Sequence, residues 1–472
     1  MRLLVITYYW PPAGGPSVQR WLKTSRELQK IGAEIEILTV DQKFATYPLI
    51  DSSLIEETNN LKVHRTFSAN WFKIYQLLTR REEIPFSGFA NQAGTPGPIQ
   101  KISRIIRGNF FLPDPRRSWN RYAIKKAIKL HKSEAFDAII TTGPPHSSHL
   151  IGKSLKKKMV FSWYADFRDP WTDIYYYEQF YPSFIARWYD KALEKSVIKN
   201  ADGLFAVSRD LIRILKNKVP NIDPKKFLEI PNGYDPNDFS STKRKIKNES
   251  YTIVYTGTLT LDYPIQLLYE SLRKIIEKPN NHLTLKIAGR PAKECIDYLS
   301  EMDKQFENFE FIYLGYLSHK RSVQLLESAD CLLLLIPNIK ENKGILTGKI
   351  FEYIGSGKVI WGFGPEKFVP DSKINPNDQF TYLLSKTGFN RFEIIDNKLS
   401  RPMDSYIDFN AIAKGYAVDE VAEFLKNKQI DNFLVEIGGE INSLGINIDK
   451  NKPWLVAIDM PRFDGDRSNY SS

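Results

Sequence analysis

The pattern of apolar and polar residues changes between Gly362 and Ser372, and this change limits what the chain can fold into. Before it, short apolar runs alternate with segments of helical period, which predicts βαβ units and parallel sheets covered by helices on both faces. After it, a different pattern begins, whose most distinctive stretch is DFNAIAKGYAVD at residues 408–419. We therefore expect an α/β chain made of two unrelated segments, neither of which is whole.

Two series of apolar runs predict two parallel sheets in the first segment. The first series covers residues 2–10, 33–40, 136–143, 159–166 and 201–208, and the second covers 251–257, 283–289, 309–315, 331–337 and 358–364. Residues 229–250 between them are rich in Pro, Asn, Asp, Ser and Lys, which predicts a linker. We expect doubly wound, Rossmann-like domains at 1–228 and 251–366, the second one truncated, and an incomplete α+β fragment at 372–472. Two such domains leave a ligand cleft at the carboxyl ends of both sheets.

Composition indicates a globular protein. The 472 residues suffice for two or three domains, and 42% hydrophobic with 26% charged residues is ordinary for a folded chain.

The N-terminal MRLLVITYYW is too short for a secretory signal, and no apolar stretch approaches the roughly 20 residues of a membrane span. The only cysteines, Cys295 and Cys331, lie in apolar runs, which favours a reducing compartment and excludes a metal–thiolate site. We expect a cytoplasmic protein.

Charge is divided unevenly along the chain. From Asp371 onward, 12 Lys and Arg oppose 16 Asp and Glu, so this part carries −4 and residues 1–370 carry +15 of the total of +11. Such an excess suits anionic partners such as nucleotide diphosphates, lipid phosphates or an anionic bilayer at the inner face of the plasma membrane. RYAIKKAIKLHK at residues 121–132 could lie on such a bilayer as a basic amphipathic helix, although a simple solvated helix is the favoured interpretation. Nucleic acid is not an expected partner.

The strongest local signal before the change is TGKIFEYIGSGKVI at residues 347–360. Thr347 can cap a short helix, and Lys349 and Glu352 then share one face at i,i+3. The free N–H groups and positive dipole end of that helix suit a diphosphate, and the carboxylate could accept hydrogen bonds from ribose hydroxyls. The alternative is a surface ion pair on an ordinary helix.

Further motifs follow in a fixed order. PPAGGPSVQRW at residues 11–21 places Gly14 and Gly15 between a strand and a helix, where backbone N–H groups can face a ligand. After this motif come, in order, FAVSRDL, IPNGYD, VYTGTL, KIAGR and LGYLSHKRSVQLLESAD. Together these motifs, over residues 1–364, resemble glycosyltransferase family 4, retaining enzymes of the GT-B fold. The resemblance implies that Glu352 holds the nucleotide ribose, that Lys349 holds the diphosphate, and that Gly14 and Gly15 form the donor or acceptor loop.

TTGPPHSSHLIG at residues 141–152 and WYADFRDPW at residues 163–171 resemble one subset of that family. By this resemblance Asp166, Arg168 and Asp169 belong to the acceptor side. His146 and His149 follow a strand end, where a histidine could bind sugar hydroxyls or make a structural hydrogen bond. We expect His146, Asp166, Arg168 and Asp169 to serve catalysis.

The chain also departs from the family pattern. Many members have a Glu eight residues before the ribose-binding Glu, where this chain has Gly344. An Arg and a Lys that others show after the first strand of the second domain are absent from TGTLTLDY, so diphosphate binding depends more on Lys349 and on Arg290. No metal or other cofactor is expected for this part.

The segment at residues 383–445 resembles the middle of FAD:protein FMN transferases of the ApbE type, since IAKGYAVD is followed by VEIGGE at a specific spacing. The resemblance implies that Lys414, Gly415 and Tyr416 lie near the flavin and that main-chain carbonyls at 411–413 face magnesium. Gly438 and Gly439 admit close backbone approach, which a tight strand turn would explain equally well. FAD and Mg²⁺ are expected only if this part functions. Because the metal-binding carboxylate and threonine of the pattern lie beyond Ser472, we expect no flavin transfer.

The leading hypothesis is a retaining glycosyltransferase that moves a sugar from a nucleotide-diphosphate donor to a glycan or lipid-linked acceptor. Positive groups would hold the leaving diphosphate while the transferred sugar becomes oxocarbenium-like. The alternatives are a flavin transferase and an inactive chimera of two truncated genes.

Overall fold

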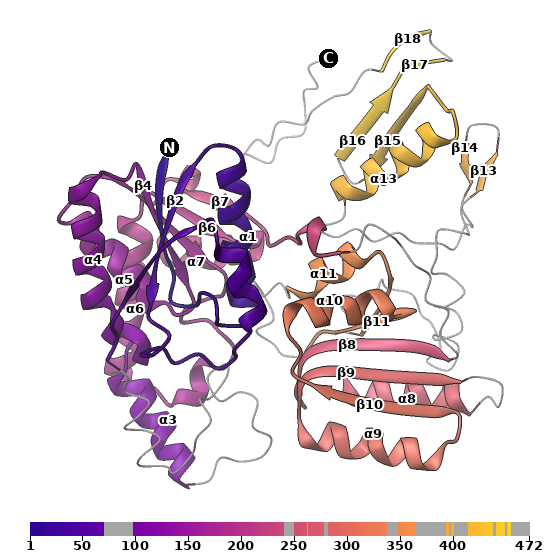
Figure 1. Ribbon diagram of the computed structural model, residues 1–472, viewed down its shortest axis with the longest axis horizontal. Coiled ribbons are helices and arrows are strands. Elements are labelled where there is room, and N and C mark those ends of the chain that lie inside the picture. Colours follow the sequence, from indigo (N-terminus) through magenta and orange to yellow (C-terminus); the bar gives the residue numbers. More distant parts are fainter. Residues whose placement is uncertain are drawn as a thin grey trace. The chain divides into compact units, whose positions relative to one another are not determined.

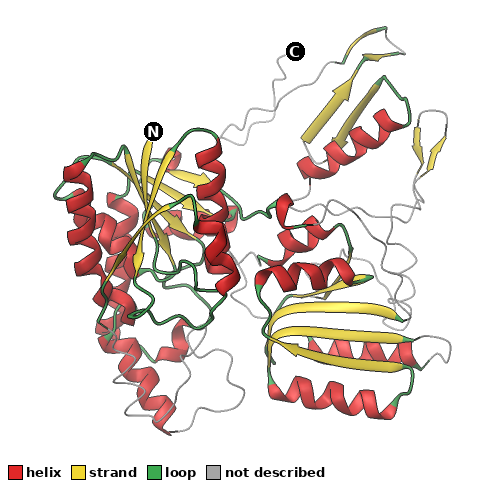
Figure 2. Cartoon of the chain, in the orientation of Figure 1, coloured by secondary structure: helices red, strands yellow, loops and turns green. Residues whose placement is uncertain are grey.

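The computed structural model describes most of the chain. The described ranges are 1–69, 98–239, 250–261, 263–277, 282–337, 348–363, 393–395, 398–400, 414–437, 440–448 and 451–454. The chain forms two compact units, Met1–Asp371 and Ser372–Ser472, and the first contains two parallel sheets, each with its own helices (Figures 1 and 2).

The first sheet has seven parallel strands in the order β3-β2-β1-β4-β5-β6-β7. Its strands are β1 (Arg2–Ile6), β2 (Glu34–Val40), β3 (Lys62–Thr66), β4 (Ala138–Gly143), β5 (Ser162–Phe167), β6 (Gly203–Ala206) and β7 (Phe227–Glu229). Strand β1 pairs with β2 on one side and β4 on the other, so the winding direction reverses there. At such a switch point the loops after the two strands separate and leave room for a ligand.

Six helices connect these strands in the part of the chain that the structure describes, and two of them begin at a serine cap. They are α1 (Pro16–Lys30), α3 (Pro98–Phe110), α4 (Asn120–Ser133), α5 (Ser147–Lys156), α6 (Phe184–Asn200) and α7 (Arg209–Lys218). The hydroxyls of Ser183 and Ser208 accept hydrogen bonds from the N–H groups three residues on, which starts α6 and α7. Between helices and sheet lies a core that includes the fully buried Trp10, Trp119 and Trp163.

The second sheet has five parallel strands in the order β10-β9-β8-β11-β12, with its own switch point between β8 and β11. Its strands are β8 (Tyr251–Leu259), β9 (Leu283–Pro291), β10 (Phe309–Gly315), β11 (Cys331–Leu335) and β12 (Val359–Phe363), and its helices are α8 (Ile265–Ile276), α9 (Lys293–Gln305), α10 (His319–Ser328) and α11 (Lys349–Ser356). Two apolar clusters cover opposite faces. One joins α8 and α9 to the sheet through Leu268 and Leu299, and the other joins α10 and α11 through Leu326 and Tyr353.

The described part of the second unit is smaller. A hairpin pairs β13 (Glu393–Ile395) with β14 (Lys398–Ser400), and the helix α13 (Lys414–Asn427) packs on the antiparallel pair β15 (Phe433–Ile437) and β16 (Glu440–Leu444). The short strands β17 (Ile446–Asn447) and β18 (Lys452–Pro453) pair with each other. Val418 and Ala422 of α13 and Phe433 of β15 are buried.

The α/β fold class and all ten strands predicted from apolar runs are confirmed. The sequence pattern missed β3 and β7. Both are edge strands and neither has the continuous apolar run that is typical of a parallel strand buried on both faces, whereas the edge strands β10 and β12 of the second sheet do have apolar runs. Strand β3 reads KVHRT and β7 has only three residues.

Candidate functional site

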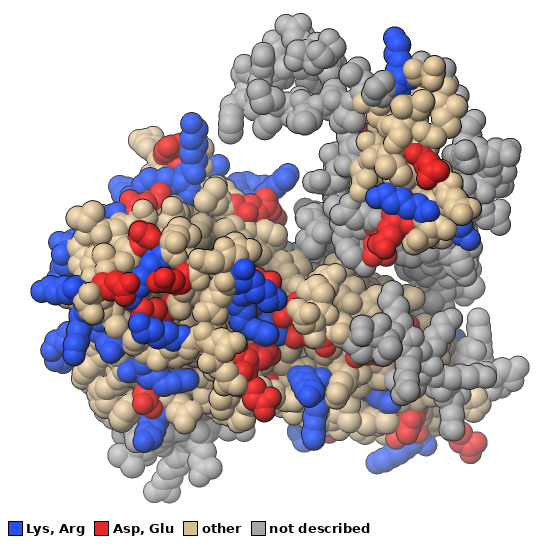
Figure 3. All heavy atoms as spheres, turned by 45° about the horizontal axis from the view of Figure 1, so that its top comes forward, with Lys and Arg blue, Asp and Glu red and all other residues tan. Residues whose placement is uncertain are grey.

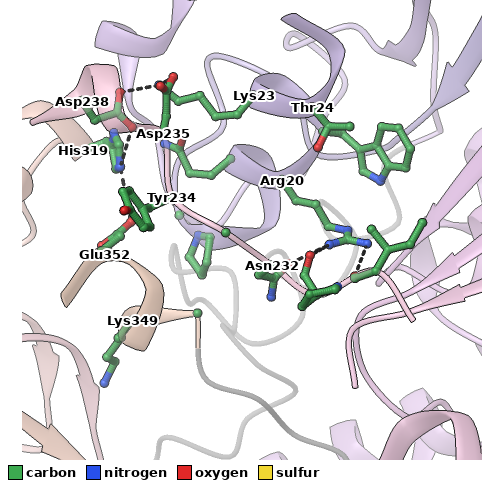
Figure 4. Close-up of a pocket in the computed structure, with 18 of the residues that line it drawn as sticks. Arg20, Lys23, Thr24, Asn232, Tyr234, Asp235, Asp238, His319, Lys349 and Glu352 are labelled. Atoms are coloured by element: carbon green, nitrogen blue, oxygen red, sulfur yellow. Dashed lines mark hydrogen bonds and ion pairs between the residues drawn. The ribbon is translucent and has the colours of Figure 1, made fainter. Parts of the chain in front are cut away.

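A cavity of about 1570 Å³ lies at the carboxyl ends of the second sheet's strands (Figure 4). On that side its walls come from Gly257 near the end of β8, Arg290 near the end of β9 and the start of α11. The opposite walls come from α1, from Asp51 and from residues 230–239 between the two sheets. The cavity, called the cleft below, is therefore lined by groups from both halves of the first unit.

Three helices begin beside the cleft. Gly15, with a φ of 89°, precedes α1, Ser318 precedes α10, and Gly348 precedes α11. The starts of α1 and α11 are close, since a Cβ placed on Gly348 would lie 3.8 Å from Pro16 Cβ. The N–H groups of a first helical turn have no partner within their helix, so these starts favour an anion. The N-cap of α11 is Gly348 rather than the predicted Thr347, which lies outside the described residues.

Two glycines form the floor of the cleft where β8 pairs with β9. Gly257 and Gly289 are partners in register and have φ values of 117° and 126°, which L side chains rarely adopt. A Cβ on Gly289 would lie 2.1 Å from the carbonyl oxygen of Gly257, and one on Gly257 would lie 2.5 Å from Lys349 Cε. Only glycine at both positions lets the lysine lie against the strand ends.

Lys349 lies at the first position of α11 with its side chain over Tyr255. Its Nζ donates a hydrogen bond of 2.6 Å to the Tyr255 hydroxyl and lies 4.2 Å from the centre of that ring. Burial lowers the pKa of Lys349 to about 7, against a smaller opposing effect of Glu352. The group can therefore change its charge near neutral pH when an anion enters.

Glu352 lies one turn further along α11 and faces His319 at the start of α10. His319 Nε2 lies 3.3 Å from Glu352 Oε1 and 4.0 Å from Asp238 Oδ2 (Figure 4). Burial lowers the pKa of His319, but the hydrogen bond and charge of Glu352 outweigh it, so the pKa is raised overall. The His319 backbone N–H donates to Asp51 Oδ2 at 2.6 Å, which connects α10 to the N-terminal half.

A compact charge cluster lies behind His319. The Nζ of Lys23 lies 2.5 Å from Asp238, 2.7 Å from Glu57 and 3.3 Å from Asp235. Within the part of the chain that the structure describes, Glu57, Asp238 and His319 are the set whose ligand atoms lie close enough to share a metal, within 4.8 Å of one another. The ammonium group of Lys23 bonds two of these three residues, so a metal would have to displace it.

The remaining predicted donor residues lie at the rim. Gly15 and Arg290 line the cleft together with Lys349 and Glu352. Arg290 is exposed and donates a long hydrogen bond of 3.4 Å to the Pro48 carbonyl, so its guanidinium can turn toward a ligand. Gly14 lies beside the cleft, where a Cβ would approach the Tyr316 hydroxyl to 2.3 Å.

Asp166 and Arg168 lie inside the first domain and hold it together. Asp166 is fully buried and accepts hydrogen bonds from Arg20 (2.9 Å), Trp21 (2.7 Å) and Thr142 (2.8 Å). Arg168 donates to three backbone carbonyls, those of Ser17, Gly143 and Pro144, and so ties the loop after β4 to the start of α1. Neither residue is among those that line the cleft.

His146 directly precedes α5 and His149 lies in its first turn, and both rings stack on aromatic side chains. His146 stacks on Trp171 with ring centres 5.0 Å apart, and His149 stacks on Phe167 at 4.5 Å. Burial lowers the pKa of His149 to about 3 and that of His146 well below its ordinary value. Both are neutral at pH 7 and can act there only as hydrogen-bonding groups. Asp169 is half-buried, and burial raises the pKa of its carboxyl against the effect of Arg168.

Sequence reasoning missed two connections beside the cleft, one that ties α1 to the segment after β7 and one that joins the two sheets' domains. Arg20 bonds Asp166 and also donates to the carbonyls of Ile230 and Pro231, at 2.8 and 2.9 Å. His319 and Asp51 form the other connection. The available signal for His319 was a histidine placed directly after a strand of the second series, within LGYLSHKRSV, and for Arg20 and Asp51 we find none.

The predicted flavin residues fall partly outside the described residues. Lys414, Gly415 and Tyr416 begin α13, and Gly438 and Gly439 belong to the undescribed residues between β15 and β16. The helices that the structure describes include none that is both long and apolar enough to cross a membrane.

Each end of the chain is similar to a known protein family. Residues 20–238 match the model of Glycosyltransferase Family 4, and residues 346–471 match that of the ApbE family. The ApbE match begins before the predicted change at residues 362–372 and includes α11 and β12, which belong to the second parallel sheet. Residues 239–345 lie between the two matches. The chain is thus similar to Glycosyltransferase Family 4 in its first part and to the ApbE family in its last part.

Among curated relatives, the FAD:protein FMN transferase of Haemophilus influenzae is 38% identical over 146 residues, which are 30% of this chain and 41% of the relative. That of Vibrio cholerae is 35% identical over 176 residues, 37% of this chain and 50% of the relative. The chain therefore spans at most half the length of these relatives. Among solved structures, sucrose-phosphate synthase from Thermosynechococcus elongatus is similar with 15% identity and a TM-score of 0.47, over 81% of this chain and 89% of that one.

Proposed function

We propose that the first unit is a retaining glycosyltransferase that takes its sugar from a nucleotide-diphosphate donor bound in the cleft. The observation that carries this proposal is Lys349, half-buried at a helix start with a pKa of about 7, in a cleft rimmed by the starts of three helices. These groups supply positive charge and free N–H donors on one side of the cleft. The match of residues 20–238 to Glycosyltransferase Family 4 supports the same reading.

In this proposal the diphosphate lies between the start of α11 and the start of α1. Lys349 and Arg290 neutralise its charge as the bond to the sugar breaks, and the backbone N–H groups after Gly15 and Gly348 add fixed dipoles. Glu352 accepts hydrogen bonds from the ribose hydroxyls and keeps its orientation through His319. Gly14 and Gly15 leave room for the donor beside Tyr316.

The acceptor, a glycan or a lipid-linked sugar, approaches from the first domain. His146 and Asp169, which are half-buried, are the groups proposed to contact it. Asp166 and Arg168 act as positioning residues, because their hydrogen bonds fix the loop that carries His146 and the start of α1.

A Glu352→Ala variant tests the donor site. We expect it to bind UDP or GDP about 10- to 100-fold more weakly in calorimetry, as for the loss of a charged hydrogen-bond acceptor worth about 1.5 to 3 kcal/mol. A His319→Gln variant should lose less nucleotide affinity, since it removes only the contact that orients the Glu352 carboxylate. Glu294→Ala, an exposed substitution on α9 outside the cleft lining, is the matched control. Unchanged affinity of Glu352→Ala for both nucleotides would contradict the assignment.

The second candidate function is flavin binding by the C-terminal part of the chain, which matches the ApbE family over residues 346–471, with FAD as the cofactor. The observation that favours it is the 38% identity to an FAD:protein FMN transferase over 146 residues. Lys414, Gly415, Tyr416, Gly438 and Gly439 are the residues proposed to contact the flavin. If this is right, adding the chain to FAD will change flavin fluorescence, and Lys414→Ala will weaken the change. Identical titrations of both proteins would remove the candidate.

A further inference from the structure

The exposed face of α6 carries large apolar side chains at its start. Phe184, Ile185 and Trp188 are 84%, 74% and 64% exposed, although side chains of this size are usually buried. Positions 184, 185 and 188 lie on one side of a helix. These residues do not line the cleft, so the donor site does not explain them.

The end of α3 adds to the same surface (Figure 1). Asn109 Nδ2 donates to the Tyr181 carbonyl at 3.1 Å, and its Oδ1 accepts the Ser183 N–H at 2.8 Å, so α3 ends where α6 begins. Phe110, the last residue of α3, is 79% exposed, and Tyr181 is 42% exposed. Phe110, Tyr181, Phe184, Ile185 and Trp188 are called the aromatic tip below.

A row of lysines continues from the aromatic tip along α6. Lys191, Lys195 and Lys199 are all exposed and recur every four residues, so they extend the same face over about 12 Å. They are called the lysine row below.

The two acidic residues of α6 face inward. Asp190 is buried and accepts hydrogen bonds from Trp171 (2.9 Å) and Tyr177 (3.1 Å). Glu194 is fully buried and accepts from Thr172 and Lys218, both at 2.6 Å. The outer face of α6 is therefore left with the lysines and with Arg187, whose charge is paired with Glu178.

We infer that the aromatic tip and the lysine row form a docking surface for an anionic lipid bilayer. Trp, Phe and Ile at the tip suit insertion at the boundary between headgroups and acyl chains, and each lysine near an anionic surface adds attraction. Charge complementarity selects this occupant, because the row has no exposed carboxylate on its own helix. On the face that Figure 3 shows, the first domain carries many Lys and Arg with Asp and Glu between them.

The surface differs from the one predicted at residues 121–132. In the structure those residues form α4, whose Ala123 and Ala127 are buried in the core and whose Ile124 and Ile128 pack against it. That helix has already used its apolar face, so it offers solvent only its basic side.

Vesicle co-sedimentation of the full chain tests the inference. We expect binding to phosphatidylcholine vesicles containing phosphatidylglycerol, and little to phosphatidylcholine alone. A Lys191→Glu/Lys195→Glu variant should reduce partitioning at least about tenfold, as should Phe184→Ser/Trp188→Ser. Lys125→Glu/Lys129→Glu on the exposed side of α4 carries the same charge change and is the control that should bind nearly as well as the wild type.

Three results would overturn the inference. One is unchanged partitioning of both α6 variants, and another is equal loss in the α4 control, which would indicate attraction by net charge alone. The third is a wild-type chain that does not bind vesicles but forms a concentration-dependent dimer in sedimentation. If Phe184→Ser/Trp188→Ser abolishes that dimer, the surface belongs to an interface with a second copy of the chain.

Discussion

A Lys349→Met variant will bind nucleoside diphosphates about 10- to 100-fold more weakly than the wild-type chain at pH 6. The substitution keeps the length of the side chain over Tyr255 but removes the charge, and a hydrogen bond to a charged group contributes about 1.5 to 3 kcal/mol. Calorimetric titration with UDP and GDP measures the difference. Lys293→Met is the control, because Lys293 is exposed and pairs with Asp297 on α9.

The lowered pKa of Lys349 leads us to expect proton uptake when a nucleoside diphosphate binds. Its pKa in the free protein is about 7, so at pH 8 most molecules have a neutral Lys349, and a bound diphosphate will raise the pKa and recharge it. Binding at pH 8 should therefore be accompanied by the uptake of close to one proton. At pH 5.5 Lys349 is already charged and takes up none. The affinity for the diphosphate should fall as pH rises above about 7. Calorimetry in buffers of different ionisation enthalpy counts the protons. If Lys349→Met takes up as many as the wild type at pH 8, another group is responsible.

Replacing Asp166 by alanine will destabilise the first unit by about 3 to 5 kcal/mol, because it leaves the buried guanidinium of Arg20 without its partner. The carboxylate also accepts bonds from Trp21 and Thr142, so no single neighbour can compensate. Urea unfolding measures the loss as a shift of the midpoint. Asp210→Ala, which breaks the exposed pair with Arg213, should change stability by about 0.5 kcal/mol or less.

The pH dependence of this contribution has a definite sign. Burial alone would raise the pKa of Asp166, but Arg20 and the other donors lower it below its ordinary value. A carboxyl whose pKa is lowered on folding stabilises the folded state above its unfolded pKa of about 4, and the stabilisation is lost as pH falls through the folded pKa. The Asp166→Ala deficit should therefore shrink on acidification. Full retention of unfolding free energy with loss of sugar transfer would instead make Asp166 a catalytic residue.

The apolar runs of the sequence determined the two parallel sheets. A strand covered by helices on both faces must be apolar at nearly every position, so the runs LLVI, AIIT and CLLLL can be recognised as buried strands from the sequence. The edge strand β3 carries Lys62, His64 and Arg65, and its place could be recognised only from the paired register of Lys62–Thr66 with Glu36–Val40. The spacing of Lys349 and Glu352 on α11 was likewise local information.

The partners of those residues were decided by the tertiary structure alone. Glu352 faces His319 from another helix, Asp51 reaches across to the N–H of His319, and Arg20 bonds Asp166 over a separation of 146 residues. A sequence pattern reports which side of a helix or strand is apolar, because burial acts on each element separately. Ion pairs between elements depend on how the elements cross, and so the sequence indicated the chemistry of Asp166 and Arg168 without revealing that the fold places both in its interior.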